Sequence, residues 1–315
     1  MEDLNFVYSY DLMRQEIHEL ETVHRGLVQV EVIGQTPYGR DIFAIGIGHG
    51  SACAVLSGSH HAREWMTTQL LMKMLRTYAS AYVSNYAVGG YAVREILDQT
   101  TIWFVPMVDV DGVELQQRGA TAFSESVRES LIQMNRGSED FSAWKANAEG
   151  LDLNRQYDGA WEGISVDAVT HPASKNYKGT RPFEAMEVKA LMAFLEKVNP
   201  PAEIAYHSAG EVIFWGLELD LDDPRHMAGK ELANLTGYEL LPPLSDKHGG
   251  GLTDWWTYNL GKIGFTVEIG SPTTGEGPVS QTEFPKVWEA NQAVGMWMAN
   301  YVLQNSLLSS GDVQT

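Results

Sequence analysis

Two residue types that bind metal ions stand three positions apart in the stretch His60-His61-Ala62-Arg63-Glu64. An apolar run, residues 52–56, precedes this stretch and a helical pattern of apolar residues follows it, which indicates a junction between a strand and a helix. At such a junction a His and a Glu can point toward one ion, and imidazole nitrogen and carboxylate oxygen are ordinary ligands of Zn²⁺. A catalytic zinc site has three protein ligands and an open position for water. The stretch therefore predicts two ligands, one of the adjacent histidines together with Glu64, and requires a third elsewhere in the chain.

His207 differs from the other eight of the nine histidines because it ends an apolar segment, residues 202–206. Ligands in open α/β sheets gather at the carboxyl ends of the strands. His61, Glu64 and His207 would then complete a His-Glu-His site. On this pattern alone, His207 is equally well explained as a histidine of the core, and such a site also accepts divalent ions other than zinc.

The spacing of the apolar residues predicts the helices and strands around these candidate ligands. Helical spacing covers residues 10–24, 65–81, 184–198 and 284–303, the last as one long terminal helix, and residues 109–112 are expected to form a turn. Strands that alternate with helices predict an α/β fold. We expect one domain over residues 1–315, with a central, mostly buried, mixed sheet of eight strands flanked by helices. The expected strands are residues 27–33, 41–47, 52–57, 101–108, 202–206, 211–215, 238–241 and 265–268.

Composition and charge exclude several classes of protein. A net charge of -19 argues against binding to nucleic acid or to an anionic membrane surface. Cys53 is the only cysteine, so the chain has no disulfide framework and no cysteine-based metal site. No segment approaches the roughly 20 apolar residues that a membrane-spanning helix needs. The acidic N-terminus lacks the features of a secretory signal, which predicts a cytoplasmic location. The sequence does not indicate an oligomeric state.

Five segments of the chain, taken in order, match the motifs of one enzyme family. They are His61-Ala62-Arg63-Glu64, Asn154-Arg155, His207-Ser208, Gly250-Gly251-Leu252-Thr253-Asp254-Trp255 and Phe265-Thr266-Val267-Glu268. On these segments the sequence resembles the zinc metallocarboxypeptidases of the carboxypeptidase A and B type. Each motif alone is weak, and their order is what carries the resemblance.

The resemblance implies a zinc metallopeptidase that holds one zinc ion through His61, Glu64 and His207. Bound zinc lowers the pKa of its water toward about 7 and polarises the scissile carbonyl. Glu268 is then the general base that takes the proton of this water and later delivers it to the leaving nitrogen. The family stabilises the oxyanion with an Arg that follows a Trp. Here the matching position holds Lys145, with Arg63 as a possible helper, and a solvated surface lysine is the alternative.

Substrate binding is implied for a second group of residues. Asn154 and Arg155 match the pair that binds the substrate carboxylate, and a salt bridge from Arg155 to Asp152 or Asp158 is the alternative. Ser208 directly follows the third ligand, His207, and is also expected to contact the substrate. Thr253 matches the floor of the specificity pocket, which is apolar in the A type and acidic in the B type.

One departure from the family concerns a mobile Tyr that closes on the substrate. This chain has Ser245-Asp246-Lys247-His248 at that place, and His248 is either a polar contact to the substrate or a histidine that faces solvent. Together with the residue at Thr253, this departure puts ordinary carboxypeptidase specificity in doubt.

Further segments resemble a bacterial branch of the family, the γ-D-glutamyl-L-diamino acid endopeptidases. We therefore expect a peptide or muropeptide substrate, cleaved between γ-D-Glu and meso-diaminopimelate or Lys. One alternative is a carboxypeptidase that removes C-terminal residues from ordinary peptides. Another is a zinc-binding or peptide-binding module without activity, against which the presence of Glu268 argues. The segments that carry this resemblance are 144–147, 177–184 and 206–215.

Overall fold

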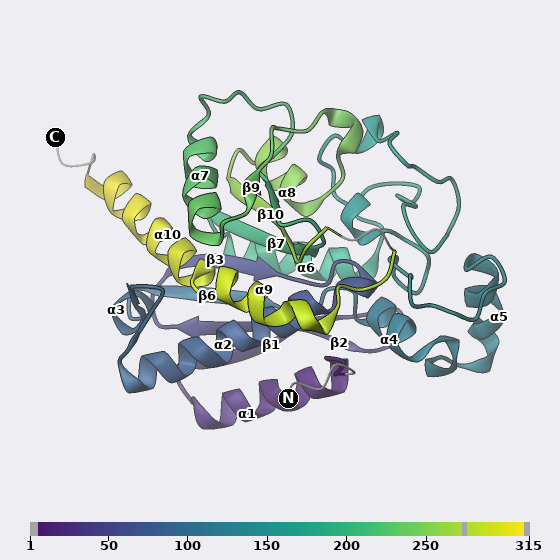
Figure 1. Cartoon of the computed structure of the whole chain (residues 1–315), viewed down its shortest axis with the longest axis horizontal. Coiled ribbons are helices and arrows are strands. Elements are labelled where there is room, and N and C mark those ends of the chain that lie inside the picture. Colours follow the sequence, from purple (N-terminus) through teal and green to yellow (C-terminus); the bar gives the residue numbers. More distant parts are fainter. Residues whose placement is uncertain (1–5, 273–275, 312–315) are drawn as a thin grey trace.

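The computed structural model describes residues 6–272 and 276–311, the last five by their backbone alone. A twisted sheet of eight strands runs through the middle of the molecule (Figure 1), in the order β1-β2-β6-β3-β7-β10-β8-β9. The strands are β1 (Val28–Gln35), β2 (Asp41–Gly48), β3 (Ala52–Ser57), β6 (Thr100–Val105), β7 (Ala202–Ser208), β8 (Val212–Phe214), β9 (Glu239–Leu240) and β10 (Ile263–Ile269). A separate two-stranded ribbon consists of β4 (Ala87–Val88) and β5 (Tyr91–Ala92).

The four central strands, β6, β3, β7 and β10, are parallel. β1 pairs antiparallel to β2, β2 to β6 and β8 to β10, whereas β8 and β9 are parallel. Central strands are buried on both faces, which explains the continuous apolar runs of β3 and β6. Because these strands are parallel, their carboxyl ends meet at one edge of the sheet. This edge receives His61 after β3, His207 within β7 and Glu268 within β10.

Helices cover both faces of the sheet. Tyr78 of α2 packs against Phe104 of β6 on one face, while Phe194 of α6 packs against Trp103 of β6 on the other. In Figure 1, α10 runs diagonally across the sheet. The helices are α1 (Tyr10–Val23), α2 (Met66–Ser84), α3 (Val93–Leu97), α4 (Val110–Arg118), α5 (Glu125–Met134), α6 (Met186–Val198), α7 (Pro224–Thr236), α8 (Leu252–Asp254), α9 (Phe284–Asn291) and α10 (Val294–Gly311).

The expected mixed eight-stranded α/β sheet is confirmed, with differences at the ends of its elements. β7 extends through Ser208, so His207 lies inside the strand rather than after it. β6 ends at Val105, because Pro106 cannot continue the hydrogen-bond ladder. The expected turn at residues 109–112 is the start of α4, where the Asp109 carboxylate accepts a hydrogen bond from the Gly112 N–H as an N-cap.

The prediction of one terminal helix over residues 284–303 is wrong. The chain breaks between α9 and α10, where the hydroxyl of Tyr78 enters the helix backbone. This hydroxyl donates to the carbonyl of Gln292 at 2.8 Å and accepts from the N–H of Gly295 at 3.1 Å. A side chain that inserts into the helical ladder in this way replaces the regular bonds and bends the helix.

Among the described residues, no helix is long and apolar enough to cross a membrane. The cytoplasmic location and the boundaries of the domain at residues 1 and 315 stay predictions.

Candidate active site

The candidate metal ligands His61, Glu64 and His207 come together at the carboxyl edge of the sheet. His61 precedes a short 3₁₀ turn, Ala62–Glu64, that brings the Glu64 carboxylate back toward it. The two Glu64 oxygens lie 2.9 Å from His61 Nδ1 and 3.0 Å from His207 Nδ1, and the two Nδ1 atoms are 3.1 Å apart. All three side chains are buried. They form the one group of metal-binding side chains with suitable spacing in the described part of the chain.

This arrangement fits a zinc ion. Ligand atoms at about 2.0–2.1 Å from a tetrahedral zinc lie roughly 3.3 Å from one another, close to the separations between these nitrogen and oxygen atoms. His60, the other histidine of the motif, turns away and places its Nε2 3.0 Å from the hydroxyl of Tyr157. The choice between the adjacent histidines is thus made by the direction of the two rings.

The Asp152 carboxylate contacts both the candidate ligand His61 and Lys145. Its Oδ1 lies 3.1 Å from His61 Nε2, and its Oδ2 accepts from Lys145 Nζ at 2.7 Å. Burial acts to raise the pKa of Asp152, but the charge of Lys145 and the hydrogen bond with His61 outweigh it and hold that pKa well below its usual range. An ionised Asp152 only accepts, so His61 donates through Nε2 and turns the lone pair of Nδ1 toward the metal position.

Sequence reasoning missed this role, because Asp152 was considered only as a salt-bridge partner of Arg155. No ion pair joins Arg155 to Asp152 or to Asp158. The guanidinium of Arg155 instead donates to the carbonyl of Asn154 at 2.9 Å. The signal for the missed role was an Asp two positions before the Asn-Arg pair.

A cavity of about 500 Å³ opens beside the metal ligands. Its lining includes the basic side chains of Arg63, Lys145 and Arg155 and the carboxyls of Glu64, Asp254 and Glu268. Nine residues expected at the site line it: His61, Arg63, Glu64, Lys145, Asn154, Arg155, Ser208, His248 and Glu268.

Glu268 lies beside His207, since the two residues are register partners on the parallel strands β10 and β7. Burial, and then the nearby Glu64 carboxylate, raise the pKa of Glu268 to about 7. A carboxyl group with a pKa near neutrality can exchange protons in both directions at physiological pH.

Asn154 and Arg155 reach the cavity from a 3₁₀ turn, Leu153–Arg155. The side-chain oxygen of Asn154 accepts from the N–H of Leu252 at 3.2 Å, so its amide NH₂ group is the free end. Gly250 permits this arrangement, because a Cβ at this position would come within 3.1 Å of the Cα of Arg155. The NH₂ of Asn154 and the guanidinium of Arg155 are donors suited to a carboxylate.

Arg63, His248 and Thr253, three of the residues expected at the site, each have particular contacts. The Arg63 guanidinium donates to the backbone carbonyl of Glu276 at 2.6 Å, which ties it to the loop after β10. His248 lines the cavity while its Nδ1 lies 3.2 Å from the hydroxyl of Ser245. Thr253 does not line the cavity, because it is buried behind Thr266, which does.

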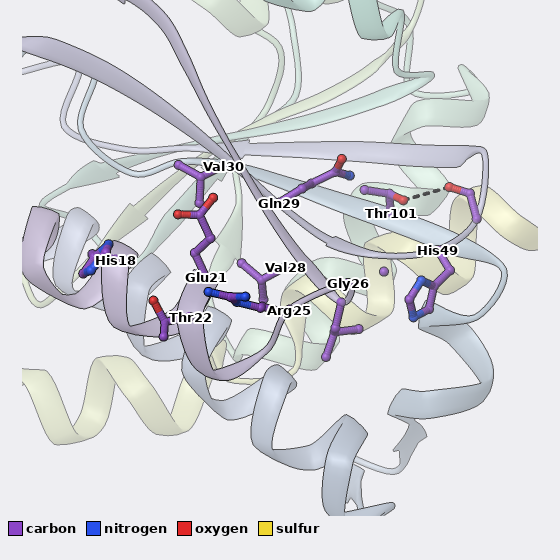
Figure 2. Close-up of a pocket in the computed structure, with 13 residues that line it drawn as sticks. His18, Glu21, Thr22, Arg25, Gly26, Val28, Gln29, Val30, His49 and Thr101 are labelled. Carbon is purple, nitrogen blue, oxygen red and sulfur yellow. Dashed lines mark hydrogen bonds between the residues drawn. The ribbon is translucent and has the colours of Figure 1, made fainter.

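A second hollow, larger than this cavity, lies elsewhere on the described part of the chain. It measures about 940 Å³ and is formed by the end of α1, the start of β1 and the turn between β2 and β3 (Figure 2). His18, Glu21, Arg25 and His49 lie around it, with no group of metal-binding side chains at suitable spacing. It shares no residue with the cavity beside His61.

Comparison with known proteins agrees with this geometry. Residues 13–294 match the sequence pattern of a protein family described as "Zinc carboxypeptidase". The chain belongs to the zinc carboxypeptidase family. It is therefore a zinc-dependent metallopeptidase, as the resemblance of its motifs implied.

Individual relatives refine this placement within the zinc carboxypeptidases. The chain is 34% identical over 297 residues to gamma-D-glutamyl-L-diamino acid endopeptidase 1 of Lysinibacillus sphaericus, covering 94% of this chain and 72% of the relative. It is 27% identical over 247 residues to metallocarboxypeptidase A of Trichophyton rubrum, covering 74% of this chain and 54% of that protein. The fold is similar to that of thrombin activatable fibrinolysis inhibitor, with a TM-score of 0.74 and 19% identity over 96% of this chain and 76% of that one.

Proposed function

We propose that this enzyme hydrolyses the bond between γ-D-glutamate and a diamino acid, meso-diaminopimelate or lysine, in peptides of the bacterial cell wall. The observation that carries the proposal is the 34% identity to an endopeptidase of that name over nearly the whole chain. The cavity supports it, because Asn154 and Arg155 offer donors for the free carboxylate of a diamino acid on the leaving side of the bond.

In this proposal His61, Glu64 and His207 hold the zinc ion. When bound there, the ion would supply Lewis acidity, which polarises the scissile carbonyl and acidifies water. Glu268 accepts a proton from the attacking water and returns it to the leaving nitrogen, a role that suits its place beside His207.

Lys145 stabilises the negative charge that develops on the carbonyl oxygen. Its ammonium group has three N–H donors, of which one is held by Asp152 at 2.7 Å and another lies 3.4 Å from the side-chain oxygen of Asn176. The remaining donor is available to the cavity that Lys145 lines. Lys145 is largely shielded from solvent, so its charge acts more strongly than that of a surface lysine.

A second candidate function is a carboxypeptidase that releases C-terminal residues from ordinary peptides. The 27% identity to a fungal metallocarboxypeptidase A favours it, and the same Asn154 and Arg155 pair would bind the C-terminal carboxylate. A third possibility, an inactive binding module, is disfavoured because Glu268, His61 and Glu64 line one cavity and His207 lies 3.0 Å from the Glu64 carboxylate.

One digestion experiment separates these functions. L-Ala-γ-D-Glu-meso-diaminopimelate and an N-blocked dipeptide are incubated in parallel with the zinc-loaded protein and with its Glu268→Gln variant. We expect release of diaminopimelate by the unaltered protein only. Cleavage of the dipeptide alone would overturn the proposal in favour of the carboxypeptidase, and no cleavage of either would favour the binding module.

A further inference from the structure

A buried carboxyl group beneath the cavity has no part in the mechanism above. Glu203 lies on β7, four residues before His207, and is almost fully buried. Its Oε1 accepts a hydrogen bond from the hydroxyl of Thr253 at 2.8 Å. Its Oε2 has no hydrogen-bond partner within the described residues. Leaving a polar atom unpaired in the core is costly, so a carboxyl group at this position calls for a specific role.

Strand register places Glu203 on the same face of the sheet as the site. In the parallel pair of β7 and β10, Glu203 is the partner of Gly264, and His207 is the partner of Glu268. Residues two and four positions apart on a strand share a face, so Glu203 points the same way as His207. Gly264 leaves the room that the carboxyl group occupies, because a Cβ there would come within 2.6 Å of Glu203 Oε1.

A chain of hydrogen bonds leads from Glu203 to the cavity. Thr266 donates to the hydroxyl oxygen of Thr253 at 2.9 Å, and Thr253 donates to Glu203. Each hydroxyl has a single hydrogen, so Thr266 has none left to donate elsewhere. Thr266 lines the cavity, so toward a ligand there its hydroxyl oxygen can only accept.

We propose that Glu203 is a positioning residue that acts through Thr253 to hold the Thr266 hydroxyl as a hydrogen-bond acceptor. This acceptor selects substrates in which the side chain of the leaving residue carries an amino group. The inference rests on the proposed function and deepens it by assigning the choice of a diamino acid to these three residues. An ammonium group offers only donors and positive charge, which matches an acceptor in a cavity whose lining also includes the Asp254 carboxyl. Burial raises the pKa of Glu203 to about 8, and a cation held at Thr266 would favour its ionised, purely accepting form.

The test compares two substrates that differ by one amino group. γ-D-Glu-L-Lys and γ-D-Glu-L-norleucine are assayed with the zinc-loaded protein, and kcat and KM are determined for each. We expect a preference for lysine of about 10- to 100-fold in kcat/KM, the range of one hydrogen bond to a charged group. In Thr266→Val and Thr253→Val this preference should fall to within a few-fold, mainly through a higher KM for the lysine substrate.

Two further variants separate positioning from a structural effect. Thr253→Ser keeps the hydroxyl and should restore the preference. Thr257→Val removes another buried hydroxyl, which donates to the Thr253 carbonyl at 2.8 Å, and should leave the lysine-to-norleucine ratio unchanged. Equal use of lysine and norleucine by the unaltered protein, or an unchanged ratio in Thr253→Val, would overturn the inference.

Failure of the proposed function gives a different result. In that case neither γ-linked substrate is cleaved, and the same ratio is measured on N-blocked α-linked dipeptides that end in lysine or norleucine. If no peptide is cleaved, calorimetry measures the affinity of the zinc-loaded protein for the same lysine and norleucine peptides. The ratio of these two affinities then takes the place of the ratio of kcat/KM values. A preference for lysine that depends on Thr253 supports the inference in each format, and its absence contradicts it.

Discussion

His61 and Asp152, which lie 91 positions apart in the sequence, are joined by a hydrogen bond of 3.1 Å between Nε2 and Oδ1. The second oxygen of Asp152 holds Lys145, so one buried carboxylate orients both a candidate zinc ligand and the candidate oxyanion contact. A histidine that donates its second nitrogen to a carboxylate is fixed in tautomer and ring orientation and becomes a stronger ligand.

Replacing Asp152 should therefore weaken zinc binding. In Asp152→Asn the amide has one oxygen to accept with and no negative charge, and we expect zinc affinity to fall by about 10- to 100-fold. Competition with a chelator measures this affinity. Asp158→Asn, an exposed change in the same segment, is the control and should bind zinc as the unaltered protein does. Equal affinity in Asp152→Asn and the control would show that His61 needs no support from Asp152.

Loss of a ligand should have a larger effect than loss of its support. We expect His207→Ala to abolish stoichiometric zinc binding, because only His61 and Glu64 remain and structural or catalytic zinc sites need at least three protein ligands. Elemental analysis after gel filtration measures the zinc content. His18→Gln, on the exposed side of α1, should retain one zinc per chain. A full zinc content in His207→Ala would exclude this residue as a ligand.

Glu268 is expected to act on protons and not on the metal. Glu268→Gln should therefore keep its zinc while kcat falls by about two to four orders of magnitude, the usual contribution of a general base. Zinc content and kcat are measured on the same preparation. An activity close to that of the unaltered protein would remove Glu268 from the mechanism.

Lys145 can be tested by changing its charge and its shape separately. Lys145→Met should lower kcat by about 100- to 1000-fold, as the loss of one oxyanion contact does elsewhere. Lys145→Arg should recover part of this loss, because it retains the charge beside Asp152. Lys230→Met, an exposed change on α7, is the control. If Lys145→Met and the control have equal kcat, Lys145 serves only to compensate the charge of Asp152.

The parts of this structure that the sequence predicts are those that depend on local pattern. Apolar runs indicate the eight strands, and the ordered motifs indicate His61, Glu64, His207 and Glu268. The rest depends on contacts between distant segments. Asp152 acquires its role only when the fold brings it to His61, and the hydroxyl of Tyr78 breaks the terminal helix from another element. In sequence, Thr253 matches the floor of the specificity pocket. In the structure its hydroxyl donates to the buried carboxyl of Glu203, a contact that no local pattern indicates.

The buried carboxyl of Glu203 also predicts how stability depends on pH. Burial raises its pKa from 4.5 to about 8, so in the folded protein it stays protonated where the unfolded chain has already released the proton. The contribution of this group to stability is complete below about pH 4.5 and is lost as the pH rises through about 8. Each unit of pKa difference corresponds to about 1.4 kcal/mol, so the loss amounts to about 5 kcal/mol at most.

Glu203→Gln removes the titrating group while keeping an oxygen that can accept from Thr253. We expect the free energy of unfolding of the zinc-loaded protein to fall less steeply in this variant than in the unaltered protein between pH 5.5 and 8.5. Urea unfolding at several pH values measures both slopes, and effects of pH on zinc binding are common to the two proteins and cancel in the comparison. Glu196→Gln, an exposed change on α6, should have the slope of the unaltered protein. Parallel curves for Glu203→Gln and the unaltered protein would mean that Glu203 is ionised in the folded state across this range, because a carboxyl group that does not retain its proton on folding adds nothing to the pH dependence.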